Sequence, residues 1–249
     1  MPTPGTSPGV LVTRPEPGLS ETLAAVSAAG WVPFASPALC ITPHSLRALP
    51  HHFAACVLTS GQAVQAAQAA LPPTCPVYAV GDRTAQRAQS AGFAVVQSAR
   101  GDAEALAALI IRSRKPESGP LLLLSGARQG MELADRLRQA GFRVVRRVAY
   151  TALPARQIAP DVLRALRAGE ISHSLFFSSE SAASWLAALP KAYRDAARHT
   201  TAIVISQAAA AVLKQAGWTQ CVVAEKPTAQ AMLAALGVCP VGRTLRSSG

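Results

Sequence analysis

Alanine, glycine and an aromatic residue follow one another at four places in the chain, and this motif constrains the fold more than any other feature. It begins at Ala29, Ala91, Ala140 and Ala216, each time after apolar residues at helical spacing. Glycine adopts the left-handed conformation that ends many helices at little cost, and the aromatic can fold back onto the last turn. Each copy therefore predicts the end of a helix and the start of a strand.

The motif is easiest to interpret within residues 121–150. Four leucines open this stretch, a run too short for a helix and typical of a strand buried on both faces. Ser125 and Gly126 follow, then a predicted helix that ends at Gly141, and residues 143–150 predict a second strand. Strands that alternate with helices in this way indicate parallel sheets with right-handed crossovers.

The same unit is half of a repeat. A shift of 111 residues aligns residues 10–43 with residues 121–154 without a gap, and shifts of 119 and 125 align later blocks that begin near Cys56 and Val77. The order of the blocks is preserved and the shift only grows, as insertions would produce. We interpret the chain as a tandem duplication of an α/β unit.

Charge and composition limit the possible partners. The formal net charge is +11, and only four of the basic residues are lysine, so arginine and alanine richness of a GC-rich genome explains the charge as well as a polyanionic ligand does. Aromatic residues make up 5% of the chain and there is no helix-turn-helix signature, which disfavours nucleic acid. No apolar run approaches the roughly 18 residues that span a bilayer, and no signal peptide is evident, so we expect no membrane partner.

Cysteine and histidine give no sign of a metal site. The five cysteines form no C-x-x-C pair, and the five histidines show no metal-ligand spacing. We interpret the cysteines as core thiols in the reducing cytoplasm. Nucleophile-elbow, Walker and dinucleotide motifs are absent from the sequence, and Asp82 is the one carboxylate at the end of a predicted strand.

A ligand site is predicted where the strands end, because open α/β sheets bind ligands beyond the carboxyl ends of their strands. Small hydroxyls and helix N-terminal amides dominate these positions and suit carboxylate or phosphate oxygens. Hydroxyls there can also act only as helix caps, and that alternative stays open for each residue. The candidate ligand-binding residues are Arg14, Thr59, Ser60, Thr84, Ser125, Gly126, Arg128, Ser178, Ser179 and Ser206.

Five short motifs resemble the uroporphyrinogen-III synthase family over about residues 10–236. They are VLVTRP at 10–15, T-S-x-x-A-V at 59–64, YAVGDRTA at 78–85, LLLLSG followed by a helix and Tyr150, and FFSSESA at 176–182. The resemblance implies two flavodoxin-like α/β domains with parallel sheets, two extended linkers and a cleft between the domains. The implied domains are residues 1–36 plus 155–249 and residues 40–149, with linkers 37–39 and 150–154.

The resemblance also implies a reaction without metal or organic cofactor. Linear hydroxymethylbilane, an octacarboxylate tetrapyrrole, would lose its hydroxyl and close to uroporphyrinogen III with ring D inverted, through an azafulvene and a spiro intermediate. Unaided, the same electrophile closes to the uninverted isomer, so orientation is the main task of such an enzyme. Tyr150 matches the family's cleft tyrosine and is the catalytic candidate, with a packing role as the alternative. Thr59, Ser60, Thr84, Ser178 and Ser179 would bind carboxylates.

One segment departs from the family pattern, and two other functions stay open. Ser206 to Ala209 lacks the glycine and threonine often found there, and Ala209 falls opposite Thr84 in the repeat. A non-catalytic two-domain binder or sensor of an anionic small molecule would use the same cleft. A polyanion-binding protein driven by its arginines is the second alternative. We expect a cytoplasmic monomer.

Overall fold

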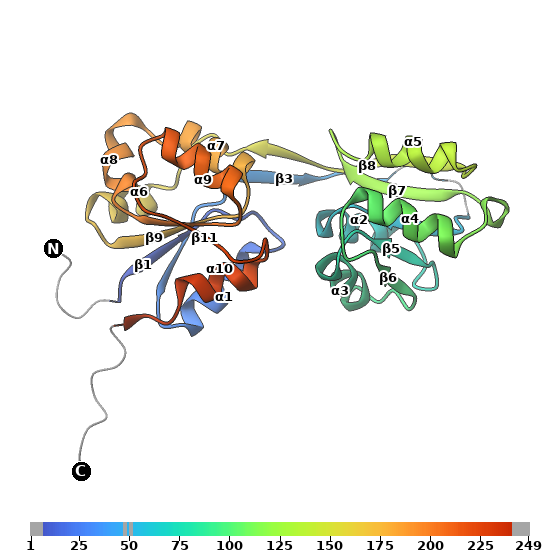
Figure 1. Ribbon diagram of the computed structural model, residues 1–249, viewed down its shortest axis with the longest axis horizontal. Helices are drawn as coiled ribbons and strands as arrows, with labels where there is room; N and C mark the ends of the chain where they lie inside the picture. The colour runs from blue at the N-terminus through green and yellow to red at the C-terminus, as the bar shows by residue number, and fades with distance from the viewer. Residues whose placement is uncertain (1–6, 47–48, 50–51, 241–249) are drawn as a thin grey trace, which may run out of the picture. The chain divides into compact units, whose positions relative to one another are not determined.

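The computed structural model describes residues 7–46, 49 and 52–240, which form two compact α/β units (Figure 1). The split unit combines Met1–Cys40 with Leu153–Gly249, and the continuous unit spans Ile41–Ala152. Residues 1–6 and 241–249 of the predicted split domain lie outside the described part of the chain. The predicted α/β class is confirmed in both units; the described strands of the split unit form a parallel sheet, and those of the continuous unit are parallel except for the edge strand β3 (Leu39–Pro43).

Five described strands form the parallel sheet of the split unit. Val12 pairs with Leu175 on one side of the central strand and with Ala35 on the other. The order is β11 (Cys221–Val223), β10 (Thr201–Val204), β9 (Ile171–Phe176), β1 (Gly9–Val12) and β2 (Val32–Ala35).

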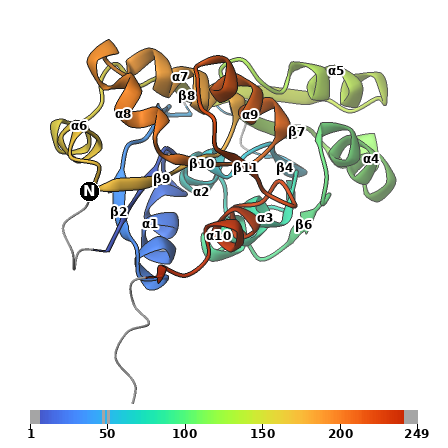
Figure 2. The same ribbon diagram turned by 60° about the vertical axis from the view of Figure 1, so that its left-hand side comes forward.

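Helices cover both faces of this sheet. On one face lie α1 (Leu19–Ala28) and α10 (Ala229–Leu236), whose Val26 and Met232 pack on Val10 and Val12. Figure 2 shows them opposite α7 and α9. The helices of the second face pack around Trp185 and Phe176 and are α6 (Pro160–Arg167), α7 (Ser179–Ala188), α8 (Arg194–Arg198) and α9 (Gln207–Gln215).

The continuous unit has a sheet of the same kind with one added strand. Its described strands are, in order, β3 (Leu39–Pro43), β8 (Val144–Pro154), β7 (Leu121–Gly126), β4 (Ala55–Leu58), β5 (Val77–Ala79) and β6 (Val96–Ser98). The pairs from β8 to β6 are parallel. His44 donates its N–H to Ala149 and Ala155 donates to Ala38, so the added strand β3 runs antiparallel to β8.

Two pairs of helices cover the continuous unit's sheet. After the short 3-10 turn Gly61–Ala63, α2 (Val64–Ala70) and α3 (Asp82–Ser90) lie on one face with Leu122 and Leu124 beneath them. On the other face α4 (Ala103–Ser113) and α5 (Met131–Gln139) cover Leu121 and Leu123. The four leucines thus alternate between two cores, which is why the run is apolar throughout.

Element bounds support the predicted duplication. At a shift of 125 residues, α3 and β6 fall on α9 and β11 residue for residue. The repeat also relates β7, β4, β5 and β6 to β1, β9, β10 and β11, and these strands stand in the same order in the two sheets. Each unit therefore combines a block from one copy with blocks from the other.

The four Ala-Gly-aromatic motifs have one geometry, as predicted. Their glycines have φ of +86°, +97°, +88° and +96°. The aromatic N–H donates each time to the carbonyl five residues earlier, as in Trp31 to Val26 and Phe142 to Leu137. The aromatic rings are at most 5% exposed. Each motif thus ends a helix with a left-handed glycine and anchors the next segment in the core.

Three local features differ from what the sequence indicates. The prolines of residues 31–41 favour an extended segment, more a linker than a central strand, and the structure forms the regular edge strand β2 there, a place where Pro33 removes no needed hydrogen bond. The sequence predicts Asp161 as a helix cap, but α6 begins after Ala159 with a proline in its first turn. The short helix α8 is not predicted by the sequence, because five residues are too few to show a period.

Both chain crossings between the units run through strands. They fall after Cys40 and after Ala152, inside β3 and β8. Among the described residues no helix combines the length and the apolar character that a bilayer-spanning segment requires.

Candidate functional site

Strand register brings the candidate residues of the continuous unit to one edge of its sheet. Leu58 pairs with Leu124, so Thr59, which follows β4, comes next to Ser125 near the end of β7. Gly126 pairs with Tyr150 on the next strand. The boundary between β4 and β7 is also where the connecting helices change face, the position at which open α/β sheets bind ligands.

The split unit gathers its own candidates in the same way. Val12 pairs with Leu175 and Val204 pairs with Phe176, which puts the ends of β1, β9 and β10 next to one another. Arg14 and Ser178 thus follow adjacent strands, and the connecting helices change face between them. The predicted residues at this edge are Arg14, Ser178, Ser179 and Ser206.

Tyr150 lies beneath the turn that follows β7. Its side chain is 5% exposed, and its hydroxyl donates to Gln129 Oε1 at 3.0 Å. A Cβ at Gly126 would be 3.1 Å from the Tyr150 ring, so glycine allows the ring to approach. Tyr150 is therefore held against the strand-end turn, as well as packed in the core of the unit.

The turn over Tyr150 is fixed through the main chain of Gln129. Its carbonyl oxygen accepts from Ser125 Oγ at 2.8 Å and from Arg146 Nε and Nη2 at 3.0 and 2.8 Å. Gly130 then takes φ of +79° before α5 begins. Arg146 adds weaker bonds to the carbonyls of Ala127 and Gly126.

Gln129 and Arg146 were missed by the sequence analysis. Arg128 was chosen for its charge, but its side chain is exposed while the neighbouring Gln129 reaches Tyr150. Arg146 lies within a strand, where sequence alone does not reveal that its guanidinium reaches back to the turn. The only feature of the sequence that pointed to this turn was Gln129 directly before Gly130, shortly after the strand.

Three candidate serines cap the elements that follow their strands. Ser60 accepts from Gln62 N–H at 3.3 Å, Ser178 from Ser181 N–H at 2.9 Å and Ser206 from Ala209 N–H at 3.4 Å. A capping hydroxyl uses a lone pair and keeps its proton. The hydroxyl of Ser178 donates a hydrogen bond to Ser181 Oγ at 2.9 Å. The fourth candidate serine near these caps, Ser179, is exposed at the start of α7.

Three other candidates differ in what their side chains offer. Ser125 is fully buried and donates to the main chain, so it holds the turn. Thr84 is 7% exposed in the first turn of α3. Thr59 Oγ1 is buried and has no hydrogen-bond partner among the residues that the structure describes. A buried hydroxyl without a partner is costly, and a ligand oxygen would satisfy it.

Arg14 is held beside an aromatic ring at the end of β1. Its guanidinium carbon lies 5.2 Å from the centroid of Phe177, which follows β9. It also lies against Gly18, where any Cβ would collide with the guanidinium. The preceding Thr13 donates to the Leu175 carbonyl at 2.7 Å and ties the two strand ends together. The arrangement presents a cation between β1 and β9.

Strong acids, bases and nucleophiles are not concentrated at these turns. Burial raises the pKa of the Cys56 and Cys75 thiols, which keeps them in the unreactive protonated form. Asp82 does not cap its helix; it pairs with Arg100 at 3.4 Å on the exposed surface. In the described part of the chain no three His, Cys, Asp or Glu side chains are grouped to hold a metal. The turns can bind and orient acid oxygens.

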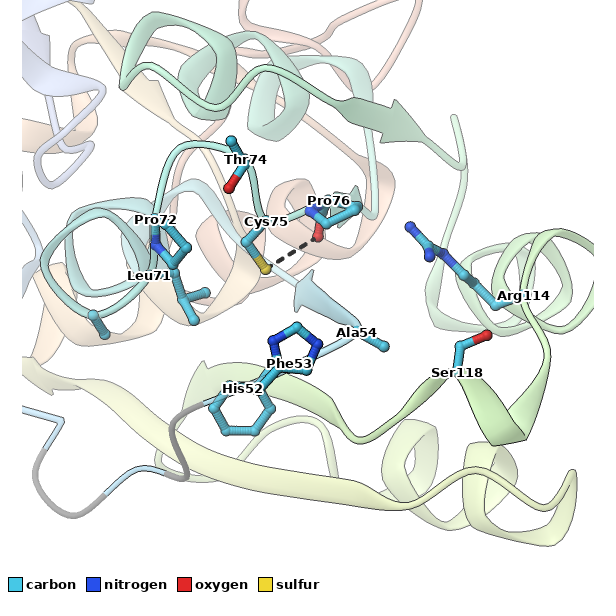
Figure 3. Close-up of a pocket in the computed structure, with 11 residues that line it drawn as sticks. His52, Phe53, Ala54, Leu71, Pro72, Thr74, Cys75, Pro76, Arg114 and Ser118 are labelled. Carbon is cyan, nitrogen blue, oxygen red and sulfur yellow. Dashed lines mark hydrogen bonds between the residues drawn. The ribbon is translucent and has the colours of Figure 1, made fainter.

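Two pockets of the continuous unit lie elsewhere. One, of about 340 Å³, is lined by Phe53, Cys75 and Arg114, which precede β4, β5 and β7 (Figure 3). It therefore opens at the amino ends of these strands, opposite the candidate turns. The other, of about 360 Å³, lies between His44 and Gln65. Neither includes a predicted site residue.

Two α/β units, each with helices on both faces of its sheet and hydroxyl-bearing turns at its strand ends, define the chain as a two-unit α/β protein. A family model described as Uroporphyrinogen-III synthase HemD matches residues 20–234. The chain belongs to this family, whose enzymes are lyases of heme biosynthesis.

Solved structures agree on the fold. The chain is similar to uroporphyrinogen-III synthetase from Helicobacter pylori 26695, with 20% identity, a TM-score of 0.61 and coverage of 92% of this chain and 98% of that one. A mutant uroporphyrinogen III synthase from the extremely thermophilic bacterium Thermus thermophilus gives 21% identity and a TM-score of 0.51, with 92% and 97% covered. The comparison with curated proteins yields no match.

Proposed function

We propose that this chain converts hydroxymethylbilane into uroporphyrinogen III with inversion of ring D and release of water. The observation that carries the proposal is the family match over residues 20–234. The strand-end turns would hold the carboxylates of the flexible substrate so that only the inverted ring closure is within reach, which is a task of orientation. The net charge of +11 is compatible with an octacarboxylate ligand.

Within this proposal the candidate residues have different tasks. The capping serines keep hydroxyl groups and helix N-terminal amides at the strand ends, where carboxylate oxygens are bound well. Arg14 supplies a cation held in place by Phe177. Thr59 supplies a buried hydroxyl that no described residue satisfies. The proposed set is completed by Thr84, the exposed Ser179 and Arg128, and Ser125 and Gly126 of the turn after β7.

Tyr150 is the proposed partner of the departing hydroxyl. A phenol is a weak acid, so its contribution is a hydrogen bond. We expect Tyr150→Phe to lower kcat about tenfold, the effect of losing one such bond, with the ratio of product isomers still favouring type III. A variant with full activity or with none would contradict this role.

The decisive experiment supplies hydroxymethylbilane to the purified protein and separates the product isomers by chromatography after oxidation. The proposal predicts type III well above the type I that forms without enzyme. The alternative, a non-catalytic binder or sensor of an anionic small molecule, predicts only type I while the ligand still binds. The matching family is one of enzymes, and no feature of the structure favours that alternative.

We also propose a monomer that works in the cytoplasm without nucleic acid. All cysteines among the described residues are free thiols, as suits a reducing compartment. Light scattering tests the mass against 25.8 kDa, and a filter-binding assay with DNA and RNA tests the exclusion of nucleic acid.

A further inference from the structure

The hydroxyl of Tyr150 carries a single proton, and in this structure that proton is already in use. The phenol donates it to the amide oxygen of Gln129 at 3.0 Å. A phenol has one O–H donor, so it cannot donate at the same time to a departing hydroxyl. If the phenol proton turns to the substrate, the Tyr150 oxygen and Gln129 Oε1 face each other without a proton between them, which favours a change at Gln129.

The main chain of Gln129 leaves little room for that change. Its carbonyl oxygen is bonded by Ser125 Oγ and by two nitrogens of Arg146, and its N–H donates to Gly126 at 3.1 Å. The residue as a whole is exposed, so its side chain is not packed on all sides. The part free to reorient is the terminal amide, whose oxygen and nitrogen exchange places by a half-turn with almost no change of shape.

We propose that Gln129 is a positioning residue for Tyr150, which acts by reversing its side-chain amide. With the NH₂ group toward the phenol, Gln129 donates to the Tyr150 oxygen and the phenol proton points to the substrate hydroxyl. The two hydrogen bonds then run in one direction and strengthen each other. This inference rests on the proposed function and names the residue that makes Tyr150 a donor.

The surrounding structure fits a neutral amide at this position. Gly126 leaves space for both partners, since a Cβ there would be 3.1 Å from Gln129 Oε1 and equally close to the Tyr150 ring. Arg146 satisfies the turn's carbonyl groups independently of the side chain of Gln129. Substitution of the side chain should therefore leave the turn in place.

The test is a double-mutant cycle of Gln129→Met and Tyr150→Phe, with kcat and KM measured on hydroxymethylbilane. Methionine keeps the length of glutamine and removes the amide. We expect Gln129→Met to lower kcat about five- to tenfold, with KM changed less than about twofold. In the Tyr150→Phe background the same substitution should change kcat less than about twofold, because its effect passes through the phenol. Gln139→Met, at the exposed end of α5, is the matched control and should match the wild type.

Three outcomes are distinct. Effects of Gln129→Met and Tyr150→Phe that multiply, or a change in KM alone, would overturn the inference. Wild-type kcat in Tyr150→Phe would remove the role of Tyr150, and type I product from the wild type would remove the proposed function itself. If Gln129→Met melts at a lower temperature than the control, the cycle is repeated with Gln129→Ala, which also removes the amide and should give the same loss of kcat.

Discussion

The two units share a scaffold and differ at its strand ends. Five described strands of one sheet have repeat partners in the same order in the other. Yet β7 ends in the turn that holds Tyr150 and Gln129, whereas β1 ends in Arg14 beside Phe177. The buried strands and the helix ends have kept their pattern, because packing restricts them on every side. The turns are less restricted, so their side-chain contacts differ where the fold does not.

The largest expected effect concerns how the two cores are filled. Trp185 is 1% exposed in the split unit and donates to Ser36 Oγ at 2.8 Å, whereas the equivalent position of the continuous unit is Ala66. Trp185→Ala should cost about 3–5 kcal/mol of stability through the cavity, and more if buried Ser36 stays without a partner. Because the cores of the two units share no residue, urea denaturation followed by circular dichroism should show an early transition for the split unit.

Trp185→Phe is the control for that prediction, since it retains a ring in the same core. It should shift the early transition less than the alanine variant does. A single transition in Trp185→Ala, displaced as a whole, would mean that the two units unfold together, and the comparison of separate cores would fail.

The second prediction concerns the turn that distinguishes the continuous unit. Gly126→Ala would place a methyl group 3.1 Å from the ring of Tyr150 and from Gln129 Oε1. The ring must move by a few tenths of an ångström, and kcat should fall about tenfold, because misplacement of a reacting group is costly. Steady-state kinetics should give the same kcat for Gly126→Ala with and without Tyr150→Phe. If the effects of Gly126→Ala and Tyr150→Phe on kcat multiply, Gly126 does not act through Tyr150.

Much of the fold could be predicted from the sequence, because its signals are local. Gly141 and Phe142 end a helix by their own conformations, and Leu121 to Leu124 identify a buried strand without knowledge of its neighbours. The edge strand β2 was missed because Pro33 resembles a linker residue until the sheet edge is known. Local signals therefore predict elements better than their places in the sheet.

The candidate site was less predictable than the fold. Strand-end position selected Tyr150 and Thr59 as candidates, since parallel strands bring their carboxyl ends together, and the register places them at one edge of the sheet. It did not identify Gln129 or Arg146, whose contacts depend on the direction of a side chain across a turn. Charge pointed to Arg128, which is exposed. The direction in which a side chain points is set by tertiary packing, whereas its position at a strand end can be predicted from the sequence.

The third prediction compares Thr59 with its repeat partner Ser178. Thr59 Oγ1 is buried without a partner among the described residues, whereas Ser178 caps α7 through Ser181. Thr59→Val should leave the unfolding free energy unchanged or slightly higher and raise KM a few-fold, because it removes an unsatisfied hydroxyl that we assign to substrate. Ser178→Ala should lower stability by about 0.5–2 kcal/mol through loss of the cap. Urea denaturation and KM measured on both variants test the pair, and a destabilised Thr59→Val with unchanged KM would reverse the assignment.

The smallest expected effect is a pH dependence confined to the split unit. Burial lowers the pKa of His173 from its ordinary value of 6.5, and its ring meets Trp31 edge-on at 4.8 Å. The repeat partner in the continuous unit is Ala54, which does not titrate.

Between the lowered pKa of folded His173 and the value of 6.5, this histidine is protonated more in the unfolded chain than in the folded one. The stability is therefore full above about pH 6.5 and falls as the pH drops toward the folded pKa. The urea midpoint of the split unit should thus decrease between pH 8 and pH 5, and less so in His173→Gln. His199→Gln, on the exposed end of α8, is the control and should follow the wild type. If the urea midpoint falls equally with pH in the wild type and in both variants, groups other than His173 cause the pH dependence.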